Sequence, residues 1–166
     1  MLKNGNYSKR NTSLKDCWRA WHHSLTKKIL AGSTAVAFGK YHITLGWSGV
    51  GYHLIIEPKN IVHTPRGPRA RIVYANDIML RTYNVGNWAI GICVAGDYRY
   101  DELDDTTKAT IDELQEALAA DNIGKGDKSH NEFPGYSWKA CCVFDYQKVF
   151  KFLDGKKPVV KTISGP

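Results

Sequence analysis

Apolar residues recur with two different periods along the chain, which predicts strands separated by helices. Residues 17–23 alternate between two faces, as in a strand, so His22 and His23 are expected to point to opposite sides. Residues 52–57 predict a second strand, followed by a turn in the Pro-Lys-Asn sequence. Residues 88–95 are almost continuously apolar, which predicts a strand buried on both faces at the centre of a sheet.

Three helices are predicted from caps and helical spacing. Ser33 is expected to cap a helix that ends near residue 45, where Gly46 can take a backbone angle that other residues avoid. Residues 106–122 carry an apolar stripe at helical spacing behind an acidic cap, which is Asp104 or Asp105.

The third predicted helix covers residues 144–153, with Asp145 as its candidate cap and apolar residues facing inward. Strands alternating with helices predict an α/β fold, a single domain with a central mixed β-sheet flanked by helices. A chain of 166 residues with 43% apolar residues is long enough for one such core. We assign residues 1–154 to this domain. Residues 155–166 lack periodicity and are interpreted as a C-terminal tail or the start of a linker.

The chain contains no run that approaches the roughly 18 apolar residues of a membrane span. Its polar first residues also lack the apolar centre of a secretion signal, so we expect synthesis in the cytoplasm without a signal peptide. The net charge of +7 suits an anionic partner, either a bacterial cell wall with its anionic polymers or a nucleic acid. Residues 66–71 are the densest basic stretch, but no nucleic-acid-reading element accompanies them, which disfavours nucleic acid.

The candidate chemistry lies late in the chain, where His130 is followed eleven residues later by Cys141. His and Cys are good zinc ligands, and His22 or His23 could supply a third. A site with three ligands and no obvious fourth is typical of a catalytic zinc, which keeps one position for water. Cys141 and Cys142 are adjacent and cannot easily bridge to each other, so a disulfide framework is a poor interpretation of the four cysteines.

Four sequence blocks occur in a family order. They are Trp21-His22-His23-Ser24-Leu25-Thr26, Gly46-Trp47-Ser48-Gly49-Val50-Gly51-Tyr52-His53, Ile90-Gly91-Ile92-Cys93-Val94-Ala95-Gly96, and the segment from His130 to Cys141. In this order the chain resembles the type 2 N-acetylmuramoyl-L-alanine amidases, a family that includes phage endolysins and peptidoglycan recognition proteins. The resemblance spans about residues 18–153, nearly the whole chain.

This resemblance implies that one zinc ion is held by His22, His130 and Cys141. It also places a catalytic tyrosine at Tyr52, whose hydroxyl could bond the developing oxyanion. Lys139 lies two residues before Cys141 and would stabilise the tetrahedral intermediate with its positive charge.

The implied reaction is zinc-dependent hydrolysis of the amide bond between N-acetylmuramic acid and L-alanine in peptidoglycan. The protein would then be an endolysin or autolysin that acts on the cell wall after release. One alternative is a non-catalytic peptidoglycan-binding module of the same fold. A less favoured one is a basic nucleic-acid-binding protein with a structural zinc, which needs a fourth ligand such as Cys142.

The substrate groove departs from the family pattern. Relatives carry a histidine-containing segment before the central strand, whereas this chain has residues 80–84 there, after a candidate insertion at residues 66–76. The proposed substrate-binding residues are polar or aromatic side chains near these segments: Trp47, Arg66, Arg81, Asn84 and Asn87. Four further groups are interpreted as packing or surface residues, or as groups that orient a ligand: His42, His53, His63 and Asn131. Cys142 is interpreted as a small apolar filler.

Overall fold

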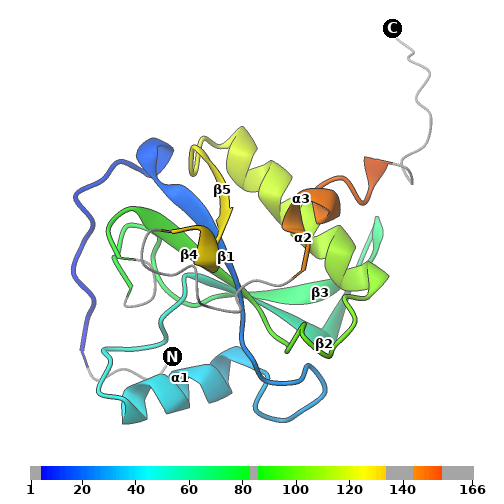
Figure 1. Cartoon of the computed structure of the whole chain (residues 1–166), viewed down its shortest axis with the longest axis horizontal. Helices are drawn as coiled ribbons and strands as arrows, with labels where there is room; N and C mark the ends of the chain where they lie inside the picture. The colour runs from blue at the N-terminus through cyan, green and yellow to red at the C-terminus, as the bar shows by residue number, and fades with distance from the viewer. Residues whose placement is uncertain (1–4, 83–85, 134–143, 155–166) are drawn as a thin grey trace, which may run out of the picture.

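The sheet is built around two short parallel strands, β1 (Trp18–His23) and β4 (Ala89–Val94). We describe residues 5–82, 86–133 and 144–154 of a computed structural model. The five strands follow the order β3-β2-β4-β1-β5, so β4 is the central strand (Figure 1). All six residues of β4 are buried, which confirms the prediction from its continuous apolar run.

The other strands complete a mixed sheet. On one side of the parallel pair, β5 (Gly126–Ser129) runs parallel to β1. On the other side, β2 (Leu54–Thr64) runs parallel to β4 and antiparallel to β3 (Gly67–Tyr74). This arrangement confirms the predicted α/β class with a central mixed sheet.

The predicted turn at Pro-Lys-Asn is wrong. Strand β2 continues through Pro58, and the register shifts between Glu57 and Ile61. Proline is tolerated at such an irregularity because the ladder hydrogen bond that it cannot donate is already missing. The chain reverses later, at Pro65 and Arg66, and the candidate insertion at residues 66–76 contains all of β3.

Among the described residues, three α-helices accompany the sheet, together with 3-10 turns at Leu14–Asp16 and His130–Glu132. Helix α1 (Ala35–Thr44) begins one residue later than predicted, because Thr34 caps it by accepting the Ala37 N–H. The Ser33 hydroxyl instead donates to carbonyls of the preceding loop. Helix α2 (Asp105–Ala120) has Asp104 as its cap, one of the two predicted residues.

Helix α3 (Tyr146–Val149) is shorter than the predicted helix of residues 144–153, although Asp145 caps it as expected. Tyr146 and Val149 are buried, and the turns that follow are held where the Leu153 N–H donates to Asp112 of α2 at 2.8 Å. The segment that follows α3 is thereby fastened to α2 at Leu153. Residues 155–166, predicted to be a tail or linker, lie outside the described residues.

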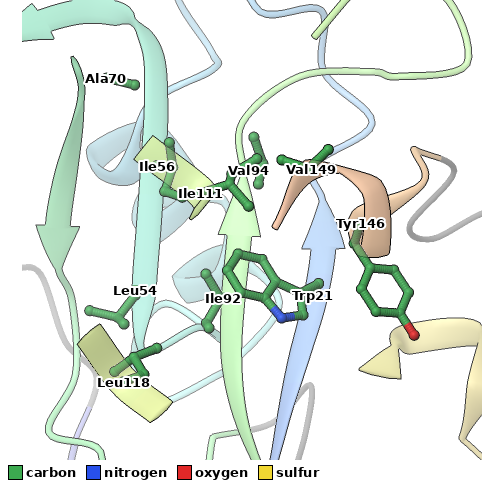
Figure 2. Close-up of a cluster of buried hydrophobic side chains, with 10 residues drawn as sticks. All are labelled: Trp21, Leu54, Ile56, Ala70, Ile92, Val94, Ile111, Leu118, Tyr146 and Val149. Atoms are coloured by element: carbon green, nitrogen blue, oxygen red, sulfur yellow. The ribbon is translucent and has the colours of Figure 1, made fainter. Parts of the chain in front are cut away.

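The sheet separates two apolar cores. Leu54, Ile56, Ile92 and Trp21 pack with residues of α2 and α3 on one face, which Figure 2 shows. On the opposite face, alternate strand residues pack with α1. These are Ile55 of β2 and Cys93 of β4, which contact the core formed by Ala35 and Phe38. The molecule therefore has three layers, with α2 and α3 above the sheet and α1 below it (Figure 1).

None of the helices in residues 5–82, 86–133 and 144–154 is both long enough and apolar enough to cross a membrane.

Replacing Ile111 of α2 with Ala is expected to lower the free energy of unfolding by about 2–5 kcal/mol, because the side chain is 0% exposed and its removal leaves a cavity. Ile29 provides a matched control, since it is 78% exposed and its replacement with Ala should change stability by less than about 0.5 kcal/mol. Urea denaturation of both variants measures the difference. Equal losses in the two variants would contradict the assignment of Ile111 to the core.

Candidate active site

His22 and His130 meet at the carboxyl ends of two neighbouring parallel strands. Strand β1 ends at the two histidines, and β5 ends at Ser129, which pairs in register with Trp21. The residue after each member of this pair is therefore brought to the same edge of the sheet. The two imidazole rings have centroids 4.4 Å apart and planes inclined at 62°, and the residues are 1% and 5% exposed.

Alternation along β1 separates the two adjacent histidines, as predicted. His22 is paired with Cys93 of β4, whose side chain belongs to the core on the α1 face. His23 points to the other face, where its Nδ1 accepts the Tyr98 N–H at 3.0 Å. Of the two candidate upstream ligands, only His22 therefore lies beside His130.

Tyr52 joins the histidine pair from the loop before β2. Its ring centroid lies 5.2 Å from that of His22, with the planes at 62°. On its other side, the His42 ring of α1 lies 5.9 Å away, and His42 in turn packs on Trp47 at 4.3 Å. Five aromatic side chains thus form a continuous row on the α1 face, in the order Trp47, His42, Tyr52, His22 and His130.

The turn that carries His130 is held by its own polar side chains. Ser129 and Glu132 form a capping box, and the Ser129 hydroxyl also bonds Asn131. Burial alone would raise the pKa of Glu132, but hydrogen bonds from Tyr146 and Ser129 and the charge of Lys128 hold it below its usual value. A carboxylate anchored in this way fixes the direction in which His130 leaves the strand.

The donors that converge here suit zinc. Imidazole nitrogens are among its commonest ligands, and two buried histidines at ring contact provide two of the three expected. Cys141, the third, and Lys139 lie outside the described residues, as does Cys142. Within the residues that are described, no group of three His, Cys, Asp or Glu side chains could hold a metal ion. The two described histidines are therefore of the donor type that zinc takes, and the third predicted ligand is outside the described residues.

The predicted substrate-binding residues are dispersed. Trp47 is connected to Tyr52 through His42. Arg66 is 77% exposed and pairs with Glu113 of α2 at 3.3 Å, on the face of the sheet away from His22.

Two of the remaining substrate candidates, Arg81 and Asn87, lie near the N-terminal segment. Arg81 borders an open groove of about 360 Å³ that reaches the loop before Tyr52 through Ser48. The Asn87 side chain accepts the Asn11 N–H at 2.6 Å. Asn84 lies outside the described residues.

Two residues near Tyr52 were not assigned a specific role from sequence. His42 is buried, and its Nδ1 accepts the Gly51 N–H at 2.9 Å. Asn76 is also buried, and its amide donates to the carbonyls of Val50 and Tyr52. The His42 spacing before the Gly-Tyr-His block could have suggested such a contact, because one helix and a tight turn connect them. No local signal marks Asn76, which comes from a different strand connection.

Burial lowers the pKa of both His42 and His53 to about 4. His53 is fully buried, with Nδ1 accepting the Gly91 N–H and Nε2 donating to the Leu80 carbonyl at 2.7 Å. His63, in contrast, is exposed on β2. His53 is therefore a neutral packing residue that ties β4 to the loop before it.

These pKa values predict that the free energy of unfolding decreases as the pH is lowered from about 6.5 to about 4. In that range each histidine is protonated in the unfolded chain but stays neutral in the folded protein, so acid favours unfolding by at most about 3 kcal/mol for each residue. Urea midpoints measured from pH 4 to pH 8 test this. His42→Asn should reduce the slope and His63→Ala should preserve it; identical slopes in all three proteins would contradict the cause.

Comparisons with known proteins find structural likeness at low sequence identity. No protein-family model matches the sequence, and no curated protein matches it. Among solved structures, the endolysin N-acetylmuramoyl-L-alanine amidase LysCS from Clostridium intestinale is 17% identical, with a TM-score of 0.53 over 90% of this chain and 92% of its own.

Two recognition proteins show the same likeness. Bumblebee PGRP-SA is 13% identical with a TM-score of 0.63, covering 81% of this chain and 80% of its own. Human PGRP-IBETAC, solved in complex with glycosamyl muramyl pentapeptide, is 9% identical with a TM-score of 0.59, covering 76% and 78%. The chain therefore has the fold shared by N-acetylmuramoyl-L-alanine amidase endolysins and peptidoglycan recognition proteins.

Proposed function

We propose that this protein is a zinc-dependent amidase that hydrolyses the bond between N-acetylmuramic acid and L-alanine in peptidoglycan, with residues 1–154 as its catalytic domain. One observation carries the proposal: His22, His130 and Tyr52 come from three separate elements and meet on one face of the sheet. A strand end, a 3-10 turn and a loop would have no packing reason to place three polar aromatic groups together. Catalysis supplies such a reason.

The roles of the residues follow from their chemistry. One zinc ion, held by His22, His130 and Cys141, would polarise the amide carbonyl and lower the pKa of a water molecule. Tyr52 would donate a hydrogen bond to the oxygen that becomes negative, since its ring already contacts His22. Lys139 would stabilise the same charge. The proton for the leaving amine could come from Tyr52, Lys139 or water.

Substrate binding is assigned to the α1 face. Trp47 would stack on the substrate beside Tyr52, and Arg81, Asn84 and Asn87 would contact it from the segment before β4. Arg66 is a weaker candidate, because it is paired with Glu113 on the other face.

The partner would be bacterial peptidoglycan, and the site of action the cell wall after the protein is released. Support comes from two neighbours of this fold, an endolysin amidase and a recognition protein bound to a muramyl pentapeptide. The positive net charge suits the anionic polymers of a cell wall.

The main alternative is a peptidoglycan-binding module without activity. The likeness to recognition proteins favours it as much as the endolysin likeness favours the enzyme. Only the enzyme would break a bond in peptidoglycan, so product analysis separates the two.

Purified protein incubated with peptidoglycan should release new N-terminal L-alanine. A chelator should stop the release, and added zinc should restore it, because the metal would polarise the amide carbonyl and activate the attacking water. Labelling of free amines identifies the new end group. New reducing sugars without new L-alanine amines would refute the amidase, and binding without any cleavage would favour the recognition module.

Replacing His22 with Ala should reduce bound zinc from one ion per chain to a small fraction, since two ligands hold zinc far more weakly than three. His63→Ala is the matched control, because that histidine is exposed on β2 and should leave zinc content unchanged. Elemental analysis of the purified, folded variants gives the ratio without any activity assay. Full zinc content in His22→Ala would remove His22 from the ligand set.

A further inference from the structure

The loop that precedes Tyr52 starts from a defined helix end. Gly46 follows α1 with φ +85°, and its N–H donates to the Ile43 carbonyl, while the Trp47 N–H donates to the His42 carbonyl at 3.1 Å. This pair of bonds is a Schellman motif, which needs a left-handed residue and so favours glycine. The start of the loop, which comprises residues 46–52, is therefore hydrogen-bonded to the backbone carbonyl of His42.

The same histidine holds the other end of the loop. Its ring packs on Trp47 with centroids 4.3 Å apart, and its Nδ1 accepts the Gly51 N–H at 2.9 Å. Because Nδ1 is an acceptor, the ring proton of the neutral imidazole belongs on Nε2. Burial lowers the pKa of His42 to about 4, so the acceptor is available throughout the neutral range.

Two further side chains clamp the loop from outside. Asn76 donates to the carbonyls of Val50 and Tyr52 at 2.8 Å each. The Tyr7 hydroxyl donates to the Gly49 carbonyl at 2.6 Å. Each of residues 49–52 thus has one backbone group bonded to a side chain, and for Gly51 that group is the N–H that His42 accepts.

Gly51 is the point where this restraint matters. Glycine has the widest choice of backbone angles, and a rotation at Gly51 would swing the next residue, Tyr52, away from His22. With Gly51 fixed, the Tyr52 ring sits 5.2 Å from His22, on the side of the sheet where His130 also lies. A side chain that restrains Gly51 thus sets the direction of Tyr52.

We propose that His42 is a positioning residue, which fixes Gly51 through its Nδ1 and thereby aims the Tyr52 hydroxyl at the reacting amide. This inference rests on the catalytic role proposed for Tyr52. It differs from a packing role, because packing depends on the shape of the ring, whereas positioning depends on one acceptor atom.

Two substitutions separate these roles. His42→Asn keeps a carbonyl oxygen near the place of Nδ1, whereas His42→Gln moves its amide one bond further out and loses the contact with Gly51. We expect His42→Gln to lower kcat by about 10- to 100-fold while KM changes by less than about threefold, because misplacement of a reacting group costs rate rather than binding. His42→Asn should recover most of kcat.

Hydrogen exchange of the Gly51 amide checks the contact directly. The amide should be protected in the wild type and in His42→Asn, and should exchange at least about tenfold faster in His42→Gln. Equal protection in all three proteins would overturn the proposal.

A double-mutant cycle with Tyr52→Phe tests the connection to catalysis. If His42 acts through the Tyr52 hydroxyl, His42→Gln should cost little more in the Tyr52→Phe protein. If the two losses multiply, His42 acts independently and the inference is wrong.

The outcomes also separate this inference from the proposed function. A wild type that releases no L-alanine amines would refute the amidase and the positioning role together. An active wild type with unchanged kcat in His42→Gln would refute only the positioning role. Should His42→Gln fail to fold, Asn76→Asp offers a second test, because it turns the donor to the Val50 and Tyr52 carbonyls into an acceptor. The same loss confined to kcat is expected there, and wild-type kcat in Asn76→Asp would count against the clamp.

Discussion

The parallel pairing of β1 with both β4 and β5 is the constraint on which the rest of the molecule depends. Strand β1 has only six residues, yet its alternation supplies Trp21 to one core and His22 to the site on the other face of the sheet. Trp21 enters the core beneath α2, and its indole N–H donates to Asp127 of β5 at 2.9 Å. His22, one residue later, faces α1 beside His130. A shift of one residue in this register would exchange the faces to which Trp21 and His22 point. The imidazole would then be buried in the apolar core, and the tryptophan would lie at the site.

The site itself is arranged by buried polar groups rather than by apolar packing. Apolar contacts are non-directional and fix where a segment lies, but not which way its backbone groups point. The 46–52 loop is directed by its hydrogen bonds with His42, which accepts, and with Asn76 and Tyr7, which donate. The His130 turn is directed by its capping box and by Tyr146. These side chains bond the segments that they orient, so the direction of each segment is set by specific polar atoms.

Much of this arrangement could be predicted from the sequence because it is local. The burial of residues 89–94, the opposite directions of His22 and His23, and the cap at Asp104 all follow from periods and caps within a few residues. The β2–β3 hairpin could not, because a proline that normally ends a strand lies at a bulge whose existence depends on the partner strand. The role of Asn76 was likewise hidden, since its two acceptors are about 25 residues upstream in a separate loop. Contacts between distant segments carry no local signal.

The partners of the charged side chains were also hidden in the sequence. The arginines of residues 66–71 look in sequence like a free basic patch, yet Arg69 pairs with Glu113 at 2.6 Å and Arg71 pairs with the buried Glu57. Arg10 is buried and donates to backbone carbonyls, among them those of Ile78 and Leu80. Arginine suits such positions because its planar fork can satisfy several acceptors at once. These arginines therefore act within the fold, and a count of basic residues overstates the charge available to an anionic partner. These ion pairs weaken the case for nucleic-acid binding through the basic stretch at residues 66–71.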